Sequence, residues 1–176
     1  DIEYESNKIV LDLTPVRENL QGYVWHVPCK VAGKPKLSIG IGDFRIFAAR
    51  PRANLKEILM RDLQSRNVHP EEQLWESHPI HWFSGADRIS SPHAILVGDA
   101  AGIEPAFGGG IHLSLSYGDL AARAIIDAYD RRDFSFQDYR HKFNDHQVGR
   151  SIFENSRLAL KMYSGKTNPL DTIRDD

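Results

Sequence analysis

The stretch from Ile95 to His112 constrains this chain more than any other part of its sequence: it reads Ile-Leu-Val-Gly-Asp-Ala-Ala-Gly-Ile-Glu-Pro-Ala-Phe-Gly-Gly-Gly-Ile-His. It begins inside a wholly apolar run, 94–97, which is typical of a strand buried on both faces in a parallel sheet. A glycine-rich loop follows, and then a segment from about Gly110 to Tyr129 that is apolar around much of a helix circumference. The sequence therefore predicts a strand, a loop and a helix in direct succession.

This loop carries a carboxylate at a position where α/β folds bind ligands. The predicted strand ends at Gly98 and Asp99, which places the Asp99 side chain at the carboxyl edge of the sheet. A carboxylate there accepts hydrogen bonds from the hydroxyl groups of a ribose or another polyol. The next residues, Ala100 to Gly102, have no bulk, so a large flat ligand has room close to the backbone.

The second half of the loop supplies a rigid wall and a helix start. Pro105 is rigid and has no N–H donor. Gly108, Gly109 and Gly110 open the helix, whose free N–H groups and positive dipole end favour a partial negative charge. Such an end contributes about 0.3–2 kcal/mol per favourable charge, which biases the electronics of a bound group but performs no chemistry. A packing unit of an unrelated α/β protein remains the alternative explanation.

The stretch resembles the second flavin-binding motif of the FAD-dependent oxidoreductases that include geranylgeranyl reductases, aromatic hydroxylases (flavoprotein monooxygenases) and flavin-dependent halogenases. The resemblance implies that the cofactor is FAD and that Asp99, within a Gly-Asp-Ala-Ala segment, binds the ribityl chain. It implies that Pro105 lies beside the isoalloxazine ring. It also implies that Gly108 and Gly110 begin the helix that points at the pyrimidine edge of the flavin.

The same resemblance assigns backbone contacts to the helix start. Ile111 and His112 would offer N–H groups to the O2 region of the flavin, an edge that carries charge in the reduced, anionic form. Gly102 matches the reductases and His112 the halogenases. The His112 side chain is either a proton donor or has only its backbone in use, and no catalytic side chain is identified. The predicted cofactor-binding residues are Gly98, Asp99, Ala100, Pro105, Gly108, Gly109, Gly110, Ile111 and His112.

A second match lies upstream, in Tyr23-Val-Trp-His-Val-Pro28 and the later segment 38–42, Ser-Ile-Gly-Ile-Gly. It resembles the aromatic-x-Trp-x-apolar-Pro and Gly-x-Gly segments of the substrate cavity in geranylgeranyl reductases. Side chains alternate along a strand, so Tyr23 and Trp25 share one face and would form one wall of an apolar cavity. The resemblance implies that Tyr23, Trp25 and Pro28 bind substrate. The alternative is that both aromatic residues are core residues under a sheet.

Around these motifs the pattern predicts an α+β chain in three segments. Residues 1–92 form an antiparallel-sheet substrate domain with one helix, 93–130 the flavin-proximal part of a Rossmann-like FAD-binding domain, and 131–176 a C-terminal helical segment with a tail. Asn54 is expected to cap the inserted helix, Ser135 to begin a capping box, and the tail after Gly165 to fray. The expected ranges are strands 8–13, 22–27, 37–47 and 78–83, a turn at 32–35, a helix at 54–66 and helices within 135–163.

A glycine-rich loop for the pyrophosphate is not found in this sequence. Gly40-Ile-Gly42 lacks the third glycine, since Arg45 stands at its position, and Gly165 lacks the first glycine of a phosphate loop, since Leu160 stands there. The amino-terminal dinucleotide-binding unit is therefore expected to lie elsewhere, and the chain to be a fragment or one part of a split protein. We expect it to bind FAD poorly alone and to need the missing half, or a neighbouring molecule, to cover an apolar sheet face or edge.

The composition of the chain argues against several other classes of protein and of binding site. A formal net charge of −2 over 176 residues gives no general attraction to nucleic acid, and no apolar run is long enough to cross a bilayer, although peripheral membrane contact stays open. The single cysteine, Cys29, fits a reducing cytoplasm and is expected to be an inert thiol. No metal site is expected, because His78 and His81 face opposite sides of a strand.

The preferred hypothesis is an FAD-dependent oxidoreductase that acts on an apolar small molecule, with reduction of prenyl double bonds as the first choice. NAD(P)H or another reductant is the expected electron donor. Hydroxylation or halogenation of an aromatic substrate is the close alternative. A hypothesis of another class is a non-catalytic module that binds an apolar ligand or a partner, which the missing dinucleotide loop favours and the retained Asp99 opposes.

Overall fold

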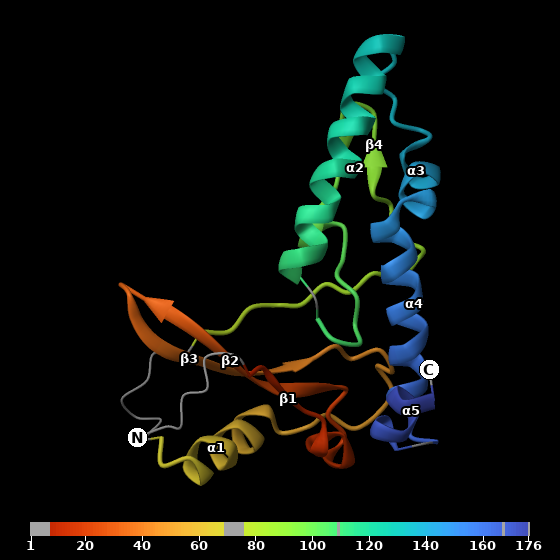
Figure 1. Ribbon diagram of the computed structural model, residues 1–176. Coiled ribbons are helices and arrows are strands. Elements are labelled where there is room, and N and C mark those ends of the chain that lie inside the picture. Colours follow the sequence, from red (N-terminus) through yellow and green to blue (C-terminus); the bar gives the residue numbers. More distant parts are fainter. Residues whose placement is uncertain (1–7, 69–75, 109, 167, 176) are drawn as a thin grey trace. The chain divides into compact units, whose positions relative to one another are not determined.

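The computed structural model describes residues 8–68, 76–108, 110–166 and 168–175, and these form two compact units. The first, which we call the sheet unit, takes in residues 1–79 and 163–176, and the second, the helical unit, takes in Ile80–Met162. Figure 1 shows the small antiparallel sheet of the first and the long helices of the second. The predicted α+β class is confirmed. The three predicted domain segments, with boundaries at 92/93 and 130/131, stay a prediction.

Three antiparallel strands in the order β1-β2-β3 build the sheet unit: β1 (Val10–Asp12), β2 (Gly22–Val31) and β3 (Lys34–Asp43). The predicted turn is a two-residue connection in which Ala32 and Gly33 have φ of 50° and 76°. Such a turn matches the right-handed twist of the flanking strands. A 3₁₀ helix, η1 (Thr14–Glu18), links β1 to β2.

Helix α1 (Leu55–Ser65) forms where the pattern predicted a helix, and it covers one face of this sheet. The Asn54 side chain accepts a hydrogen bond from the Glu57 amide at 3.3 Å, so the predicted cap is confirmed. The buried face of the helix packs on apolar side chains from β2 and β3. This core contains Ile58, Leu59 and Leu63 from α1 with Val24, Ile39 and Ile41 from the strands.

The expectation of a frayed tail is wrong, because the chain after Gly165 forms helix α5 (Pro169–Asp175). Asn168 begins it: its carbonyl accepts from the Asp171 and Thr172 amides at 3.1 and 3.2 Å. Proline at the first helical position needs no hydrogen-bond acceptor there. Arg50 holds the preceding segment by donating to the carbonyls of Tyr163 and Ser164. Local capping chemistry therefore outweighs the polar composition of the tail.

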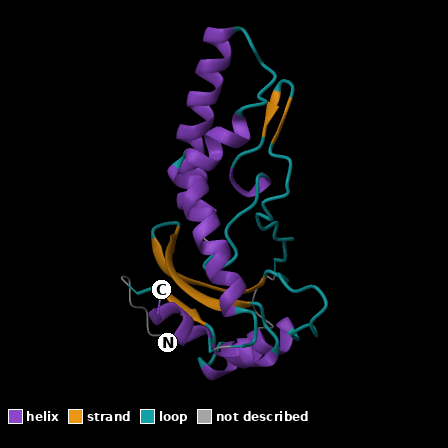
Figure 2. Ribbon diagram, turned by 90° about the vertical axis from the view of Figure 1, so that its right-hand side faces the viewer, coloured by secondary structure: helices purple, strands orange, loops and turns teal. Residues whose placement is uncertain are grey.

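Three helices form most of the helical unit: α2 (Gly110–Arg131), α3 (Tyr139–Asp145) and α4 (Gln147–Met162). Two short strands, β4 (Ser90–Ser91) and β5 (Ala94–Ile95), and the 3₁₀ helix η3 (Gly98–Ala100) complete it, and Figure 2 shows β4 and β5 as the small orange pair. One side of α2 packs against α3 and α4. The buried residues of this core include Leu113, Tyr117, Leu120, Ala124, Ala128, Tyr139, Phe143 and Ile152.

Three local predictions in this region are wrong. The strand expected at 94–97 is only Ala94–Ile95 and pairs antiparallel with β4, and Leu96 and Val97 are each 40% exposed. Among the described residues, no parallel strand adjoins β5, so the buried environment that its apolar run suits is not formed here. The strand expected at 78–83 reduces to one parallel bridge between Trp82 and Ile103.

The third error concerns the start of α3, which begins at Tyr139 and not at the predicted capping box. The Asp138 carboxylate accepts hydrogen bonds from Arg131 at 2.8 Å instead of bonding to the backbone of a helix that Ser135 begins. An ion pair with a residue from α2 therefore outweighs the local capping signal. In the part of the chain that is described, no helix combines the length and the apolar character needed to span a membrane.

Candidate functional site

The predicted loop leaves β5 through η3, where Gly98 has a φ of 55°. Glycine adopts this left-handed backbone with less strain than any residue that has a Cβ atom. A Cβ at Gly98 would also lie 2.9 Å from the Ser114 hydroxyl oxygen on α2. Two features therefore favour glycine at position 98: the left-handed backbone and the close approach of α2.

Asp99 lies beside the start of α2, although ten residues separate it from the first turn of that helix. A Cβ built on Gly110 would lie 3.4 Å from the Asp99 Oδ1 atom, and the Asp99 side chain is exposed. The loop thus brings together two of the predicted cofactor-binding residues, an exposed carboxylate and a helix start. Carboxylate oxygens accept hydrogen bonds, and the first amide groups of a helix donate them.

The small residues after Asp99 differ in their exposure to solvent. Ala100 is exposed, but Ala101 and Gly102 are buried. Gly102 has a φ of 99°, and a Cβ there would lie 2.8 Å from the backbone of Phe83. The lack of bulk at Gly102 therefore serves packing against residues 81–83, which the sequence analysis did not recognise. Among these small residues, Ala100 alone is placed to leave room for a ligand.

Sequence reasoning missed Glu104, the residue before Pro105. Its side chain is only 1% exposed, and its carboxylate accepts hydrogen bonds from the Ala106 amide at 2.7 Å and from the Phe107 amide at 3.0 Å. The side chains that commonly bond to amides a few residues ahead in a turn are the shorter Asp, Asn, Ser and Thr, so a glutamate at this position gave no clear signal. Pro105 is itself buried.

The loop ends where α2 begins, at Gly110, which is the position at which the sequence predicted the helix to start. Gly108 has a φ of 61°, and its carbonyl accepts from the Gly110 amide at 2.7 Å. Ile111 is 85% exposed and His112 is exposed. The predicted residue Gly109 lies outside the described residues. The roles assigned to all nine cofactor-binding residues stay predictions.

In the sheet unit, β2 places Tyr23 and Trp25 on one face, with ring centroids 6.4 Å apart and an edge-on geometry. Trp25 lies opposite Gly40, and a Cβ on Gly40 would fall 2.2 Å from its ring. The Gly-x-Gly segment thus provides the flat backbone that the indole covers. Strand alternation puts Pro28 on the other face, so it does not share a wall with the two aromatic residues. The substrate-binding roles of all three stay predictions.

Beneath the α1 face of this sheet lies a polar group that sequence reasoning also missed. His26 is buried, with Nε2 at 2.9 Å from the Asp62 carboxylate and Nδ1 at 3.1 Å from the Arg66 guanidinium. Because arginine only donates, Nδ1 accepts and the Nε2–H group donates to Asp62. This arrangement ties α1 to β2, and neither ring nitrogen is left for a ligand.

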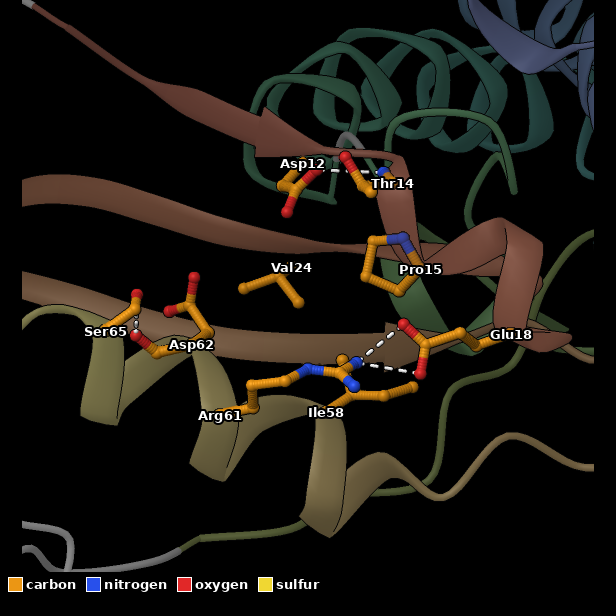
Figure 3. Close-up of a pocket in the computed structure, with 9 residues that line it drawn as sticks. All are labelled: Asp12, Thr14, Pro15, Glu18, Val24, Ile58, Arg61, Asp62 and Ser65. Carbon is orange, nitrogen blue, oxygen red and sulfur yellow. Dashed lines mark hydrogen bonds and ion pairs between the residues drawn. The ribbon is translucent and has the colours of Figure 1, made fainter.

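A pocket of about 230 Å³ adjoins this group, between η1 and α1 in the sheet unit (Figure 3). The Arg61 guanidinium donates to both oxygens of Glu18 at 2.6 and 2.7 Å, and this contact raises the Arg61 pKa. None of the predicted site residues lines the pocket. In the described ranges, no three His, Cys, Asp or Glu side chains gather as metal ligands would. The lining residues are Asp12, Thr14, Pro15, Glu18, Val24, Ile58, Arg61, Asp62 and Ser65.

Comparisons with known proteins give two partial relatives. Digeranylgeranylglycerophospholipid reductase 3 of Methanosphaera stadtmanae is 33% identical over 89 residues, which cover 48% of this chain and 22% of that protein. Ubiquinone hydroxylase UbiM of Neisseria meningitidis is 29% identical over 93 residues, which cover 51% of this chain and 20% of that protein. No protein-family model and no solved structure matches.

The matched segments span about a fifth of the length of these curated relatives. One relative is named as a reductase of a geranylgeranyl lipid and the other as a hydroxylase, and the glycine-rich motif had predicted both enzyme types. The predicted resemblance is therefore confirmed: over about half of its length, this chain is similar to oxidoreductases of the geranylgeranyl reductase and flavoprotein hydroxylase types.

Proposed function

We propose that this chain is the flavin-proximal part of an FAD-dependent oxidoreductase that acts on an apolar substrate. The observation that carries the proposal is the close approach of the Asp99 carboxylate to the start of α2, across a loop in which Gly98, Gly102 and Gly108 adopt the left-handed backbone. The two oxidoreductase relatives support the same class. A purely apolar ligand offers no hydroxyl group to this carboxylate, whereas a ribityl chain does.

The side chains and amides present fit a flavin. Asp99 would accept hydrogen bonds from ribityl hydroxyls, and the amides of Ile111 and His112 would donate to the flavin O2 region. The positive end of the α2 dipole would favour negative charge on that edge. Bound FAD would supply the redox chemistry, while the protein would supply positioning and exclusion of water.

For the substrate, we propose an apolar molecule with a prenyl chain, and reduction of its double bonds as the first reaction to test. The half-buried Trp25, edge-on to the buried Tyr23, offers an aromatic surface for such a molecule. The name of one relative refers to a geranylgeranyl lipid, and the name of the other to ubiquinone. Hydroxylation of an aromatic ring is the second candidate, favoured by the hydroxylase relative, and halogenation is a third. NAD(P)H is the proposed electron donor and the cytoplasm the proposed compartment, which the single cysteine favours.

We further propose that another protein segment covers the outer side of α2. Apolar side chains recur there at helical spacing, and Ile111 and Leu115 are 85% and 76% exposed. Exposed apolar stripes of this length usually mark a surface that another segment buries. The missing dinucleotide-binding half or a neighbouring molecule would bury them. We call this surface the outer stripe; it consists of Ile111, Leu115, Ile125, Ile126 and Tyr129.

The visible absorbance spectrum of the protein purified from its complete reading frame tests the proposal. We expect flavin bands from that protein, and no bands from the 176-residue chain purified alone. A colourless protein that also ignores added FAD would rule out the oxidoreductase and leave a non-catalytic binding module. Activity with NADPH on prenyl and aromatic substrates then separates the candidate reactions.

Asp99→Ala gives the matched test of the site itself. Loss of hydrogen bonds to a charged acceptor costs about 1.5–3 kcal/mol, so FAD should bind about 10- to 150-fold more weakly in a fluorescence titration. Asp130→Ala is the control, because Asp130 is an exposed aspartate near the C-terminal end of α2, far from the helix start that Asp99 approaches. Equal affinities for FAD in the two variants would remove Asp99 from the proposed site.

A further inference from the structure

Glu104 occupies the middle of the loop that joins two fixed points of the helical unit. On one side, Ile103 is held by residues 81–83: its amide donates to the His81 carbonyl at 3.0 Å, and its carbonyl accepts from the Phe83 amide at 2.9 Å. On the other side, the chain enters α2 at Gly110. The conformation of the residues between these two points decides where Pro105 lies and how the chain approaches the helix start.

Two amides of this intervening segment bond to the Glu104 carboxylate. Pro105 has no N–H group, and the next two amides, those of Ala106 and Phe107, both donate to the carboxylate. Both carboxylate oxygens take part, because Oε1 and Oε2 each lie 3.0 Å from the Phe107 nitrogen. Burial of a carboxylate is costly unless such bonds compensate it, so the closed loop and the buried charge require each other.

We infer that Glu104 is a positioning residue of the cofactor site: its carboxylate holds the Pro105 loop in the conformation that presents the α2 start to the flavin. This inference rests on the proposed function. It also indicates which backbone amides are available to donate hydrogen bonds to a cofactor. With the amides of Ala106 and Phe107 engaged by Glu104, the backbone donors offered to a cofactor come from the start of α2.

The chemistry of the loop predicts how substitutions at this position behave. Aspartate accepts hydrogen bonds from amides two and three residues ahead in many turns, so Glu104→Asp should keep the loop closed. Alanine offers no acceptor, so Glu104→Ala should remove the hydrogen bonds that the Ala106 and Phe107 amides donate to the carboxylate and open the loop. A matched control is Glu154→Ala, because Glu154 is an exposed glutamate on α4.

Two readouts test the inference on the protein made from its complete reading frame. The first is amide hydrogen exchange without FAD, which reports the loop alone: the Ala106 and Phe107 amides should exchange at least about tenfold faster in Glu104→Ala than in the wild type. The second is FAD affinity from fluorescence titration, which should fall at least about tenfold in Glu104→Ala. Glu104→Asp should restore both to within about threefold, and Glu154→Ala should change neither.

Each other outcome overturns the inference in a distinguishable way. Unchanged exchange at Ala106 and Phe107 would show that the carboxylate does not hold the loop. Faster exchange with unchanged FAD affinity would show that the loop does not serve the cofactor, while the proposed function stands. A wild-type protein without any affinity for FAD would overturn the proposed function and this inference together. If Glu104→Ala does not fold, the comparison of Glu104→Asp with Glu104→Gln, which keeps one oxygen and removes the charge, decides the same question.

Discussion

Helices α1 and α2 are both amphipathic, yet their outer sides differ in kind. α1 buries Ile58, Leu59 and Leu63 against the sheet and presents residues such as Lys56 and Glu57 to solvent. α2 buries one apolar side against α3 and α4 but also carries the apolar outer stripe. The difference shows that the described chain completes the burial of α1, whereas α2 has the side chains of a helix covered on both sides.

The largest expected effect comes from comparing a substitution on the buried side of α2 with one on the outer stripe. Leu120 is 2% exposed within the helical core, so Leu120→Ala should lower the free energy of unfolding of the helical unit by about 2–5 kcal/mol. Ile126 is 61% exposed on the outer stripe, so Ile126→Ala should change it by no more than about 0.5 kcal/mol in the isolated chain. Urea unfolding followed by circular dichroism measures both.

The same two substitutions, measured in the protein from the complete reading frame, test whether another segment covers the outer stripe. If another segment covers the outer stripe there, Ile126→Ala should become destabilising, by about 1 kcal/mol or more, because it then leaves a cavity. An Ile126→Ala effect that stays near zero in the longer protein would contradict a cover over this part of α2.

A smaller effect is expected in the sheet unit. Gly40→Ala would force its Cβ to within 2.2 Å of the Trp25 ring, so the indole must move and stability should fall by about 1–3 kcal/mol. The emission of the protein should change as the Trp25 ring becomes more exposed. Gly118→Ala is the matched control: nothing lies within 4 Å of a Cβ there, so alanine should stabilise α2 by about 0.5–1 kcal/mol. Unchanged fluorescence and stability in Gly40→Ala would show that the indole does not lie on Gly40.

The smallest expected effect is a pH dependence of the helical unit. A hydrogen bond from the Ser84 amide lowers the pKa of Asp87, and a hydrogen bond from Arg131 lowers that of Asp138. A carboxyl group whose pKa is lower in the folded state stabilises the fold above its unfolded pKa, near 3.8, and loses this contribution as the pH falls through the folded value. Stability should therefore fall below about pH 4.

Thermal unfolding between pH 5 and pH 2.5 measures this dependence. Asp87→Asn removes one of the two carboxyl groups, so the variant should lose less stability between these pH values than the wild type does. Asp130→Asn, at an exposed position on α2, is the control and should follow the wild type. A variant Asp87→Asn with the full acid sensitivity of the wild type would refute a role for this carboxylate.

Much of the sheet unit was predictable because its signals are local. Alternation along 22–27, the turn at Ala32 and Gly33, and the Asn54 cap each depend on residues close in sequence, and the structure contains all three. The apolar run 94–97 was misjudged for the opposite reason. Its composition suits a strand with neighbours on both sides, and those neighbours are not among the described residues, so only Ala94 and Ile95 pair.

In the candidate site, too, some features follow from residues close in sequence and others depend on distant segments. Residue types and spacing were sufficient to predict a glycine-rich loop and a helix that begins at Gly110, because backbone conformation and helix ends follow from neighbouring residues, while the cofactor-binding role of Asp99 stays a prediction. Tertiary contacts alone decided that Gly102 serves packing against Phe83, that the Glu104 side chain is buried, and that His26 lies between Asp62 and Arg66. The physical reason is that burial, and the pairing that it demands of polar groups, depends on which distant segments meet.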